Sequence, residues 1–245
     1  MRIRVINPNT TVSMTALIGE AARAVAGPGV VIDTISPADG PVSIESHYDE
    51  AMAVMGLLAE VRKGEIGDAD AYVIACFGDP GLDAARELAR GPVIGIAEAA
   101  MCTAAHLATG FSVVTTLARS VVIVEHLIVK YGLQSRCRSV RATDIAVLEL
   151  EDPRSDAYAR ILAESRLALE EDRSGAIVLG CAGMADLCRR LSADLGVPVI
   201  DGVAAAVVIA EGLVRLGLGT SKHGDYAAPL PKRYTGKLAD YAPGH

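Results

Sequence analysis

Tryptophan is absent from this 245-residue chain, and phenylalanine occurs only twice. Aromatic residues make up 4% of the sequence whereas 51% of it is apolar, so the hydrophobic core must consist mainly of aliphatic side chains. A core rich in Ala, Val, Ile and Leu is typical of parallel strands that are covered by helices on both faces. The composition therefore favours an α/β fold, either one large domain or two smaller lobes.

Positive charge is in deficit, because 23 Lys and Arg face 30 Asp and Glu. A chain with a net charge of −7 has no basic stripe to neutralise phosphates, so we expect no nucleic-acid partner. No uncharged apolar run reaches the ~18 residues of a membrane span; the longest, GVAAAVVIA at 202–210, ends at Glu211. The opening MRIRVINPNT lacks the cleavage site of an export signal. We therefore expect a cytoplasmic protein that does not bind membranes.

Cysteine is scarce, and its pattern excludes two common uses. The chain has five cysteines, and an odd number in a reducing compartment argues against a disulfide framework. No CxxC motif occurs, and Cys102 with His106, four residues apart on an expected helix, supplies only two of the ligands that a zinc site needs. The sequence therefore predicts neither disulfides nor a metal centre.

What the sequence does contain is a regular alternation of short apolar runs and helical patterns. The Val/Ile-rich runs predict buried parallel strands, and the segments between them predict helices, which together give repeated βαβ units. The expected strands are 2–6, 30–35, 71–75, 92–96, 111–115, 139–142, 176–180 and 197–201. The expected helices are about 12–26, 47–63, 80–89, 97–108, 119–131, 155–172, 184–194 and 203–217.

An internal repeat relates the two halves of the chain. VIACFGDPG at 73–81 aligns with IVLGCAGMA at 177–185, which sets Cys76 opposite Cys181. The offset between the copies is longer than the ~20–50 residues of a solenoid unit, so the repeat predicts two similar lobes related by a pseudo-twofold axis. The expected lobes are residues 1–96 with 208–245, and residues 97–207.

Cys76 and Cys181 each come at the end of an expected strand, at the carboxyl edge where ligands bind in parallel sheets. Gly78 and Gly183 let backbone N–H groups approach a ligand there, and a nearby helix N-terminus is expected to lower the pKa of each thiol. If the lobes face each other, two thiols on opposite sides of one carbon can remove a proton from one face and return one to the other. The alternative is a duplicated structural cysteine. The other cysteines are expected to be structural: Cys102, Cys137 and Cys188.

Polar side chains follow the first strand of each expected lobe. NPNTT at 7–11 and TTLARS at 115–120 present hydroxyl and amide groups ahead of a helix, where they can cap the helix or bind a ligand carbonyl. Asn9 is the better ligand candidate, because Pro8 stiffens the turn that presents it. Ser43 lies in a Gly/Pro loop before a helix, and the sequence leaves open whether it caps the helix or lines the cleft.

Taken together, these segments resemble the hydantoin and allantoin racemase branch of the aspartate/glutamate/hydantoin racemase superfamily. The segments that carry the resemblance are INPNT, YVIACFGDPGLDAARE, PVIGIAEAAM, FSVVTTL, SGAIVLGCAGMA, GVPVIDGV and LGLGTSKHGD. The resemblance implies two flavodoxin-like lobes, each a mostly parallel sheet flanked by helices, with the active site in the cleft between them. It also implies a cofactor-independent enzyme and a homo-oligomer, for which we expect a tetramer or hexamer.

The resemblance further implies a two-thiol mechanism in which Cys76 and Cys181 are the catalytic pair. One cysteine, as thiolate, removes the C5 proton of a 5-substituted hydantoin while the other, as thiol, donates on the far face, and the roles reverse for the opposite enantiomer. N–H groups behind each cysteine would stabilise the enolate that forms. The expected substrate-binding residues are Asn9, Ser43, Phe77, Gly78, Thr115, Thr116, Ala182 and Gly183.

Several alternatives stay open. Allantoin is a hydantoin with a ureido group at C5, so a dedicated allantoin racemase would have the same catalytic core. A maleate isomerase or an amino-acid racemase would keep both cysteines, but an α-carboxylate demands a cationic anchor, and no Arg or Lys adjoins either cysteine motif. A non-enzymatic two-lobe binding protein would need no matched thiols. The sequence therefore predicts an isomerase that racemises small-molecule 5-substituted hydantoins, allantoin included.

Overall fold

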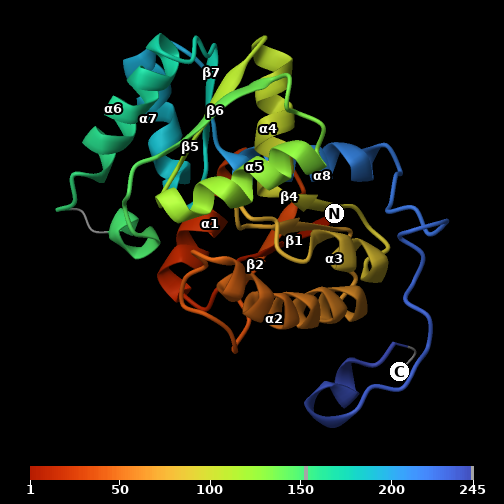
Figure 1. Cartoon of the computed structure of the whole chain (residues 1–245). Helices are drawn as coiled ribbons and strands as arrows, with labels where there is room; N and C mark the ends of the chain where they lie inside the picture. Colours follow the sequence, from red (N-terminus) through yellow and green to blue (C-terminus); the bar gives the residue numbers. More distant parts are fainter. Residues whose placement is uncertain (152–153, 244–245) are drawn as a thin grey trace.

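Two parallel four-stranded sheets form the framework of the protein (Figure 1). The computed structural model describes residues 1–151 and 154–243. The strand order is β2-β1-β3-β4 in the first sheet and β6-β5-β7-β8 in the second, so the second sheet repeats the order of the first. The strands are β1 (Arg2–Ile6), β2 (Val31–Ile35), β3 (Ala71–Ile74), β4 (Val93–Gly95), β5 (Phe111–Thr115), β6 (Cys137–Ala142), β7 (Ala176–Leu179) and β8 (Val199–Ile200).

Helices alternate with these strands, as the sequence predicts. The α-helices are α1 (Val12–Val25), α2 (His47–Ile66), α3 (Leu82–Leu88), α4 (Ile96–Leu107), α5 (Val121–Lys130), α6 (Ala157–Glu170), α7 (Cys188–Leu195) and α8 (Gly202–Arg215). Short 3-10 helices are η1 (Ala118–Ser120), η2 (Val147–Glu151), η3 (Ala182–Leu187) and η4 (Gly236–Tyr241). Two parallel sheets flanked by helices confirm the predicted fold class.

The burial of the strands follows their place in the sheets. The inner strands β3, β5 and β7 are buried along their whole length, which explains why their sequences are nearly continuous aliphatic runs. The edge strands β2 and β6 are only partly covered. The clearest departure from the predicted elements comes after β7, because the expected helix at 184–194 starts as the 3-10 helix η3 and becomes α-helical only at Cys188.

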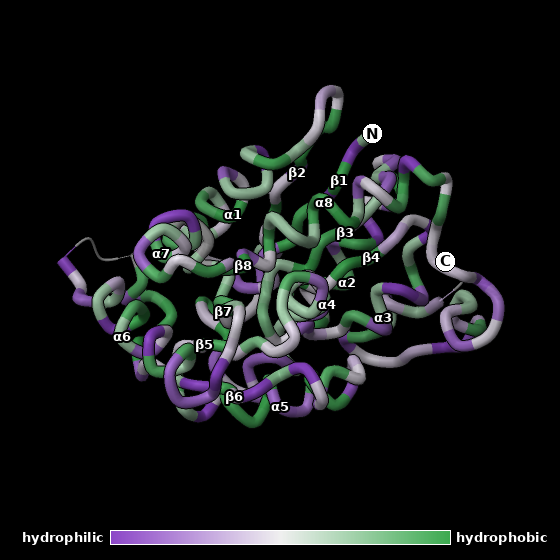
Figure 2. The backbone as a smooth tube through the Cα atoms, turned by 90° about the horizontal axis from the view of Figure 1, so that it is seen from above, coloured by the Kyte–Doolittle hydropathy of each residue, from purple (hydrophilic) through white to green (hydrophobic). Residues whose placement is uncertain are grey.

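Two helices are exchanged between the sheets. Helix α4 follows the last strand of the first sheet but packs on β7 of the second, and α8 follows the last strand of the second sheet but packs on β3 and β4 of the first. The two helices also pack against each other, and Figure 2 shows α4 between the two sheets. One core cluster therefore runs through both lobes and includes Val5, Val73, Val113 and Val178. The lobe boundaries expected from the sequence, after residues 96 and 207, stay a prediction.

The chain beyond α8 leaves the body and runs past α3 to end near α2 (Figure 1). Hydrogen bonds hold it at both ends, since the Thr220 hydroxyl donates to the carbonyl of Gly91 (2.6 Å) and the Arg62 guanidinium donates to the carbonyl of Asp240 (2.8 Å). None of the helices within the described ranges combines the length and the apolar character that a membrane crossing requires.

Candidate active site

A cavity of about 60 Å³ lies between the two sheets, at the carboxyl ends of their strands. The first lobe contributes the loop after β1, the start of α2 and the loop after β3, and the second lobe contributes the loop after β5, helix α5 and the loop after β7. The predicted site residues that line it are Asn9, Cys76, Phe77, Gly78, Thr115, Thr116, Cys181 and Ala182. Parallel strands bring these segments together because their carboxyl ends share one edge.

Cys76 and Cys181 occupy equivalent places. Each is the second residue after its strand, β3 or β7, each is partly exposed, and each lines the cavity from its own lobe. The backbone is equally tight after both, since the N–H of Asp79 donates to the carbonyl of Cys76 (3.0 Å) and the N–H of Met184 to the carbonyl of Cys181 (3.2 Å). The repeat seen in the sequence is therefore a repeat of local backbone geometry that presents two thiols to one space.

The predicted lowering of the thiol pKa is wrong for Cys76. Burial raises the pKa of this thiol well above its ordinary value; the backbone N–H of Gly78 opposes the rise, and the charges of Glu50 and Cys181 add to it. The expected helix N-terminus does not help, because α3 starts only at Leu82. Burial at this position therefore favours the protonated form of Cys76.

Asn9 is held in a fixed orientation. Its Oδ1 accepts hydrogen bonds from Asn7 Nδ2 (2.8 Å) and from the backbone N–H of Thr11 (2.9 Å), which occupies the acceptor side of the amide. The Nδ2 group donates to the sulfur of Met14 (3.2 Å), and both residues line the cavity. An amide NH2 group has two N–H donors, so one N–H of Asn9 is not used by Met14. That Asn9 binds a ligand carbonyl stays a prediction.

The two threonines after β5 differ in what their hydroxyl groups do. Thr115 donates to the carbonyl of Gly180 (3.2 Å), and a Cβ atom at Gly180 would come within 2.7 Å of the Thr115 side chain. Thr115 therefore positions the strand end that leads to Cys181. Thr116 is buried and also lines the cavity, so of the two threonines it is the better candidate for contact with a ligand.

Two predicted residues are not placed in the cavity wall. Ser43 is half-buried in the loop before α2, but Ile44, not Ser43, lines the cavity. The residue that caps α2 is Ser46, whose Oγ accepts from the N–H of Asp49 (3.2 Å). The loop before α2 is therefore three residues longer than it would be with Ser43 as the cap. Gly183 lies in η3, and its surroundings fall outside the described residues.

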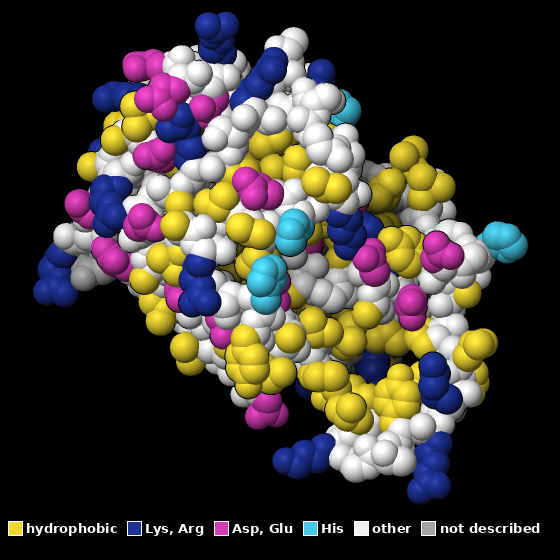
Figure 3. Space-filling model, viewed as in Figure 1, with side chains coloured by type: hydrophobic (Ala, Val, Ile, Leu, Met, Phe, Trp, Pro, Cys, Tyr) yellow, Lys and Arg dark blue, Asp and Glu magenta, His cyan; other side chains and the backbone are white. Residues whose placement is uncertain are grey.

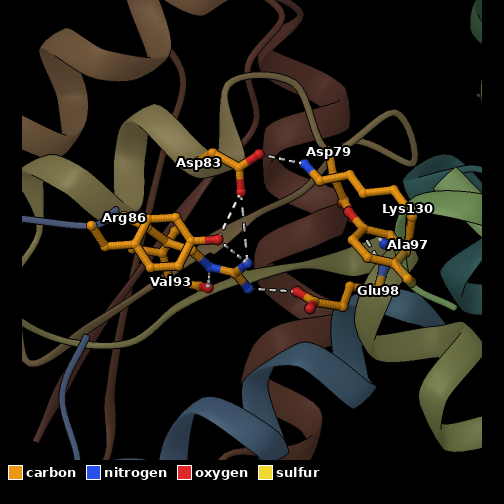
Figure 4. A network of polar contacts seen from close by, with 9 residues as sticks. Asp79, Asp83, Arg86, Val93, Ala97, Glu98 and Lys130 are labelled. Carbon is orange, nitrogen blue, oxygen red and sulfur yellow. Dashed lines mark hydrogen bonds and ion pairs between the residues drawn. The ribbon is translucent and has the colours of Figure 1, made fainter. Parts of the chain in front are cut away.

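A buried carboxylate supports the loop that carries Cys76 (Figure 4). Asp79, with a left-handed backbone (φ 45°), accepts hydrogen bonds from the N–H groups of Ala97 (3.1 Å) and Glu98 (3.0 Å) at the start of α4. The hydroxyl of Tyr131, at the end of α5, donates to the same carboxylate (2.6 Å). Burial raises the pKa of Asp79 to about 6 in spite of these donors. The Cys76 loop is thus tied to two helices that contact the other lobe.

Two contacts join the segment around the start of α2 to the second lobe. Glu45 accepts a hydrogen bond from the N–H of Val147 in η2 (3.1 Å). The imidazole rings of His47 on α2 and His126 on α5 stack with centroids 6.4 Å apart, and two histidine side chains lie side by side on the face shown in Figure 3. The segment around the start of α2 is therefore joined to η2 and α5 and forms part of the cavity wall.

The segment that leads into α2 and the first turn of the helix were not expected in the cavity wall, to which they contribute Glu45, Ser46 and Glu50. Acidic residues in the first turn of a helix are common because they interact favourably with the helix dipole, so nothing singled these out. A Cβ atom at Gly78 would come within 1.9 Å of Glu50 Oε1, which shows how closely this carboxylate packs against the Cys76 loop. Among the described residues, no group of His, Cys, Asp and Glu side chains could hold a metal ion.

Comparisons with known proteins agree with this geometry. A family model described as Asp/Glu/Hydantoin racemase matches residues 3–210. The chain is 52% identical to a hydantoin racemase from Rhizobium meliloti, covering 96% of this chain and 98% of that one. It is 47% identical to a hydantoin racemase from Pseudomonas sp. strain NS671, covering 98% and 97%. The structure superposes on an allantoin racemase from Klebsiella pneumoniae with a TM-score of 0.97 and 54% identity, covering 99% of each chain. This chain belongs to the Asp/Glu/Hydantoin racemase family, a family of isomerases.

Proposed function

We propose that this chain racemises 5-substituted hydantoins, allantoin included, by two-base proton transfer at C5. One observation carries the proposal: Cys76 and Cys181 stand at equivalent positions of a duplicated fold and line the same cavity from opposite lobes. Two thiols facing each other across a substrate are what inversion of a carbon requires, because the proton leaves one face and another arrives on the opposite face.

The proposed reaction moves two protons and breaks no other bond. The thiolate of one cysteine takes the proton from C5, and the electron pair of the C5–H bond moves into the ring to give an enolate at the C4 carbonyl. The thiol of the other cysteine then delivers its proton to the far face of C5 and becomes the thiolate. The imide ring itself activates the C5–H bond, so the mechanism uses no cofactor.

Donors in the cavity would stabilise the enolate. Asn9 lines the cavity, its orientation is fixed by two hydrogen bonds to Oδ1, and one Nδ2–H remains beyond the one that Met14 accepts. Thr116 also lines the cavity, as do Gly78 and Ala182 beside the two cysteines. Donors that are already oriented need no rearrangement as negative charge develops on the oxygen, which is why they favour the transition state.

The lining of the cavity suits a neutral cyclic amide. No Lys or Arg is among the residues described in its wall, so the anchor that an α-carboxylate substrate needs is missing there. Aliphatic side chains instead line the part nearest α5 and the loops, namely Met14, Ile44, Ile123 and Val124. Relatives at about the same identity are named hydantoin racemase and allantoin racemase, so a dedicated allantoin racemase is the second candidate.

We further propose a cytoplasmic homo-oligomer, as expected from the sequence. A groove along α1, α7 and α8 supports the assembly, because exposed apolar side chains line it beside charged groups such as Glu20 and Arg189. Val208 on α8 is 54% exposed, and Leu17 and Val25 on α1 are 38% exposed each. Contiguous exposed apolar surface of this kind commonly packs against a second copy of the chain.

Proton exchange at C5 tests the function directly. Enantiopure 5-benzylhydantoin and enantiopure allantoin are incubated with the protein in D2O, and loss of optical rotation is followed together with loss of the C5 proton signal by NMR. We expect both to occur at comparable rates and to be unaffected by EDTA. Absence of exchange with every hydantoin and with allantoin would overturn the proposal, and faster exchange with allantoin alone would favour the second candidate.

A further inference from the structure

One acidic side chain in the cavity wall has no role in the proton transfer. Glu50, in the first turn of α2, lines the same cavity as Cys76, and its Oε1 packs against the Cα of Gly78. Its side chain is 18% exposed. A carboxylate placed beside a thiol that must lose a proton opposes the reaction electrostatically, and it raises the pKa of Cys76. Because the Glu50 carboxylate makes the deprotonation of Cys76 less favourable, we looked for a contact with the substrate that offsets this effect.

The carboxylate of Glu50 has few donors of its own. Within the described ranges its polar partner is the Nδ1 atom of His47, 3.5 Å away, on an imidazole that is itself 67% exposed. Burial raises the pKa of Glu50, and the contact with His47 only partly opposes this. A buried carboxylate has room for several hydrogen bonds, so lone pairs of Glu50 remain available on the cavity side.

A hydantoin ring presents both kinds of hydrogen-bonding group. Its two carbonyl oxygens accept, and the ring N1–H and N3–H donate. The donors described in the cavity, on Asn9 and Thr116 and the backbone, match the carbonyl oxygens. Glu50 is the carboxylate with more spare acceptor capacity, because Glu45 Oε1 already accepts from the N–H of Val147, whereas the contact described for Glu50 is the one with His47. Resting on the proposed function, we infer that the Glu50 carboxylate binds the substrate by accepting a hydrogen bond from the ring N1–H.

The position of N1 in the ring distinguishes it from N3. N1 is bonded directly to C5, the carbon that a cysteine sulfur must reach, and Glu50 packs on the loop two residues beyond Cys76. N1 also lies across C5 from the C4 carbonyl, where the enolate charge develops. A carboxylate at N1 therefore holds the ring without facing the negative oxygen, and both hydantoins and allantoin carry this N–H.

An isosteric substrate tests the inference. In 5-benzyloxazolidine-2,4-dione an oxygen replaces N1–H without a change of ring shape. We expect the wild-type enzyme to prefer 5-benzylhydantoin by about 30-fold in kcat/KM for C5 exchange, each rate divided by its uncatalysed rate, because a charge-assisted hydrogen bond is lost and the carboxylate faces a lone pair. In Glu50→Ala and in Glu50→Gln, whose amide can donate to the ring oxygen, the preference should fall to within about threefold.

Matched controls separate this role from charge, fold and substrate. Glu125→Gln removes the same charge from an exposed position of α5 and should keep the full preference. The kcat/KM for 3-methyl-5-benzylhydantoin, relative to that for 5-benzylhydantoin, should be lowered by the same factor in the wild type and in both Glu50 variants. The inference would be overturned if Glu50→Gln and Glu50→Ala kept the wild-type preference for hydantoin over oxazolidinedione. It would also be overturned if these variants changed the effect of the 3-methyl group on kcat/KM instead. Wild-type enzyme that exchanges oxazolidinedione and hydantoin equally would also overturn it, whereas failure to exchange any hydantoin would overturn the proposed function itself.

Discussion

The two cysteine loops start alike and are then stabilised in opposite ways. After Cys76, the residue three positions on is Asp79, whose carboxylate reaches α4 and accepts from the N–H groups of Ala97 and Glu98. After Cys181, the corresponding residue is Met184, which is completely buried among apolar side chains. One lobe therefore uses a buried carboxylate where the other uses a hydrophobic side chain.

The helices that follow the last strands show the complementary exchange. α8 is capped locally, since Asp201 accepts from the N–H groups of Val203 (2.9 Å) and Ala204 (3.2 Å). In α4 the matching position is Gly95, and a Cβ atom there would come within 2.3 Å of the Asp79 carboxyl carbon. In the first lobe, one side chain, Asp79, both caps α4 and holds the Cys76 loop. In the second lobe two side chains share these functions, because Asp201 caps α8 and Met184 is buried in the Cys181 loop.

The largest effect is expected from the thiols, where the two loops should be equivalent. Cys76→Ser and Cys181→Ser should each lower racemisation by about 1000-fold or more, because a hydroxyl hardly ionises near neutrality and both faces of C5 must be served. Each variant should retain C5 exchange with one enantiomer, and the two should prefer opposite enantiomers, as measured by NMR in D2O. Preference of both for the same enantiomer would indicate a one-base mechanism.

The second largest effect should distinguish the two lobes, because the caps of α4 and α8 differ in what else they hold. Asp79→Ala leaves two helix N–H groups and the Tyr131 hydroxyl without their acceptor, so we expect a loss of about 3 kcal/mol in the free energy of unfolding and at least a tenfold loss of kcat/KM. Asp201→Ala should cost about 1 kcal/mol and leave kcat/KM within about twofold. Denaturant titration and C5 exchange on both variants measure this, and equal losses of kcat/KM would contradict the comparison.

The pH dependence of stability should carry the signature of Asp79. Burial raises the pKa of Asp79 to about 6 from its ordinary 3.8, so between these values the unfolded chain loses its proton first and is favoured. The free energy of unfolding of the wild type should therefore fall by about 3 kcal/mol relative to Asp79→Asn as the pH rises from 3.8 to above 6. Urea titrations of both proteins across this range check the sign, and parallel curves would show that Asp79 does not titrate in this way.

The smallest effects are expected at the cysteines outside the repeat. Cys102 and Cys137 are partly buried and Cys188 is buried, and none of the three lines the cavity that holds Cys76 and Cys181. Replacement of each by alanine should leave kcat/KM within about twofold, and Cys188→Ala should lower the free energy of unfolding by about 1 kcal/mol, since it removes one buried atom. A large loss of exchange activity in any of them would mean that the repeat does not identify all the functional thiols.

The sequence predicts the inner strands of the framework well, because strands inside a parallel sheet are covered on both faces. Continuous aliphatic runs such as those of β3 and β7 identify themselves, and the internal repeat then implies two lobes with a thiol at the same place in each. The place of Asn9 in the cavity wall also follows from the local sequence, because Pro8 and the turn that it stiffens are adjacent in the chain.

What sequence reasoning misses depends on tertiary contacts. Glu50 reaches the cavity only because α2 packs over the Cys76 loop, and Asp79 is recognisable as a cap only when α4 is known to start beside it. The prediction of a lowered thiol pKa fails for the same reason, because the burial of Cys76, which raises its pKa, outweighs any local helix dipole. The choice between Ser43 and Ser46 as the cap of α2 depends on where the helix starts, which a loop rich in Gly, Pro and Ser does not reveal.

The exchange of α4 and α8 between the sheets limits how the two lobes can move relative to each other. Each of these helices packs on the sheet of the opposite lobe, so the lobes cannot swing apart as rigid bodies without exposing the shared aliphatic core to water. Exposure of that core is costly, because apolar surface is unfavourable in water. The contacts between the start of α2 and the second lobe are few by comparison: the hydrogen bond from Val147 to Glu45 and the stacked rings of His47 and His126. A local displacement of α2 therefore costs less free energy than a hinge motion between the sheets.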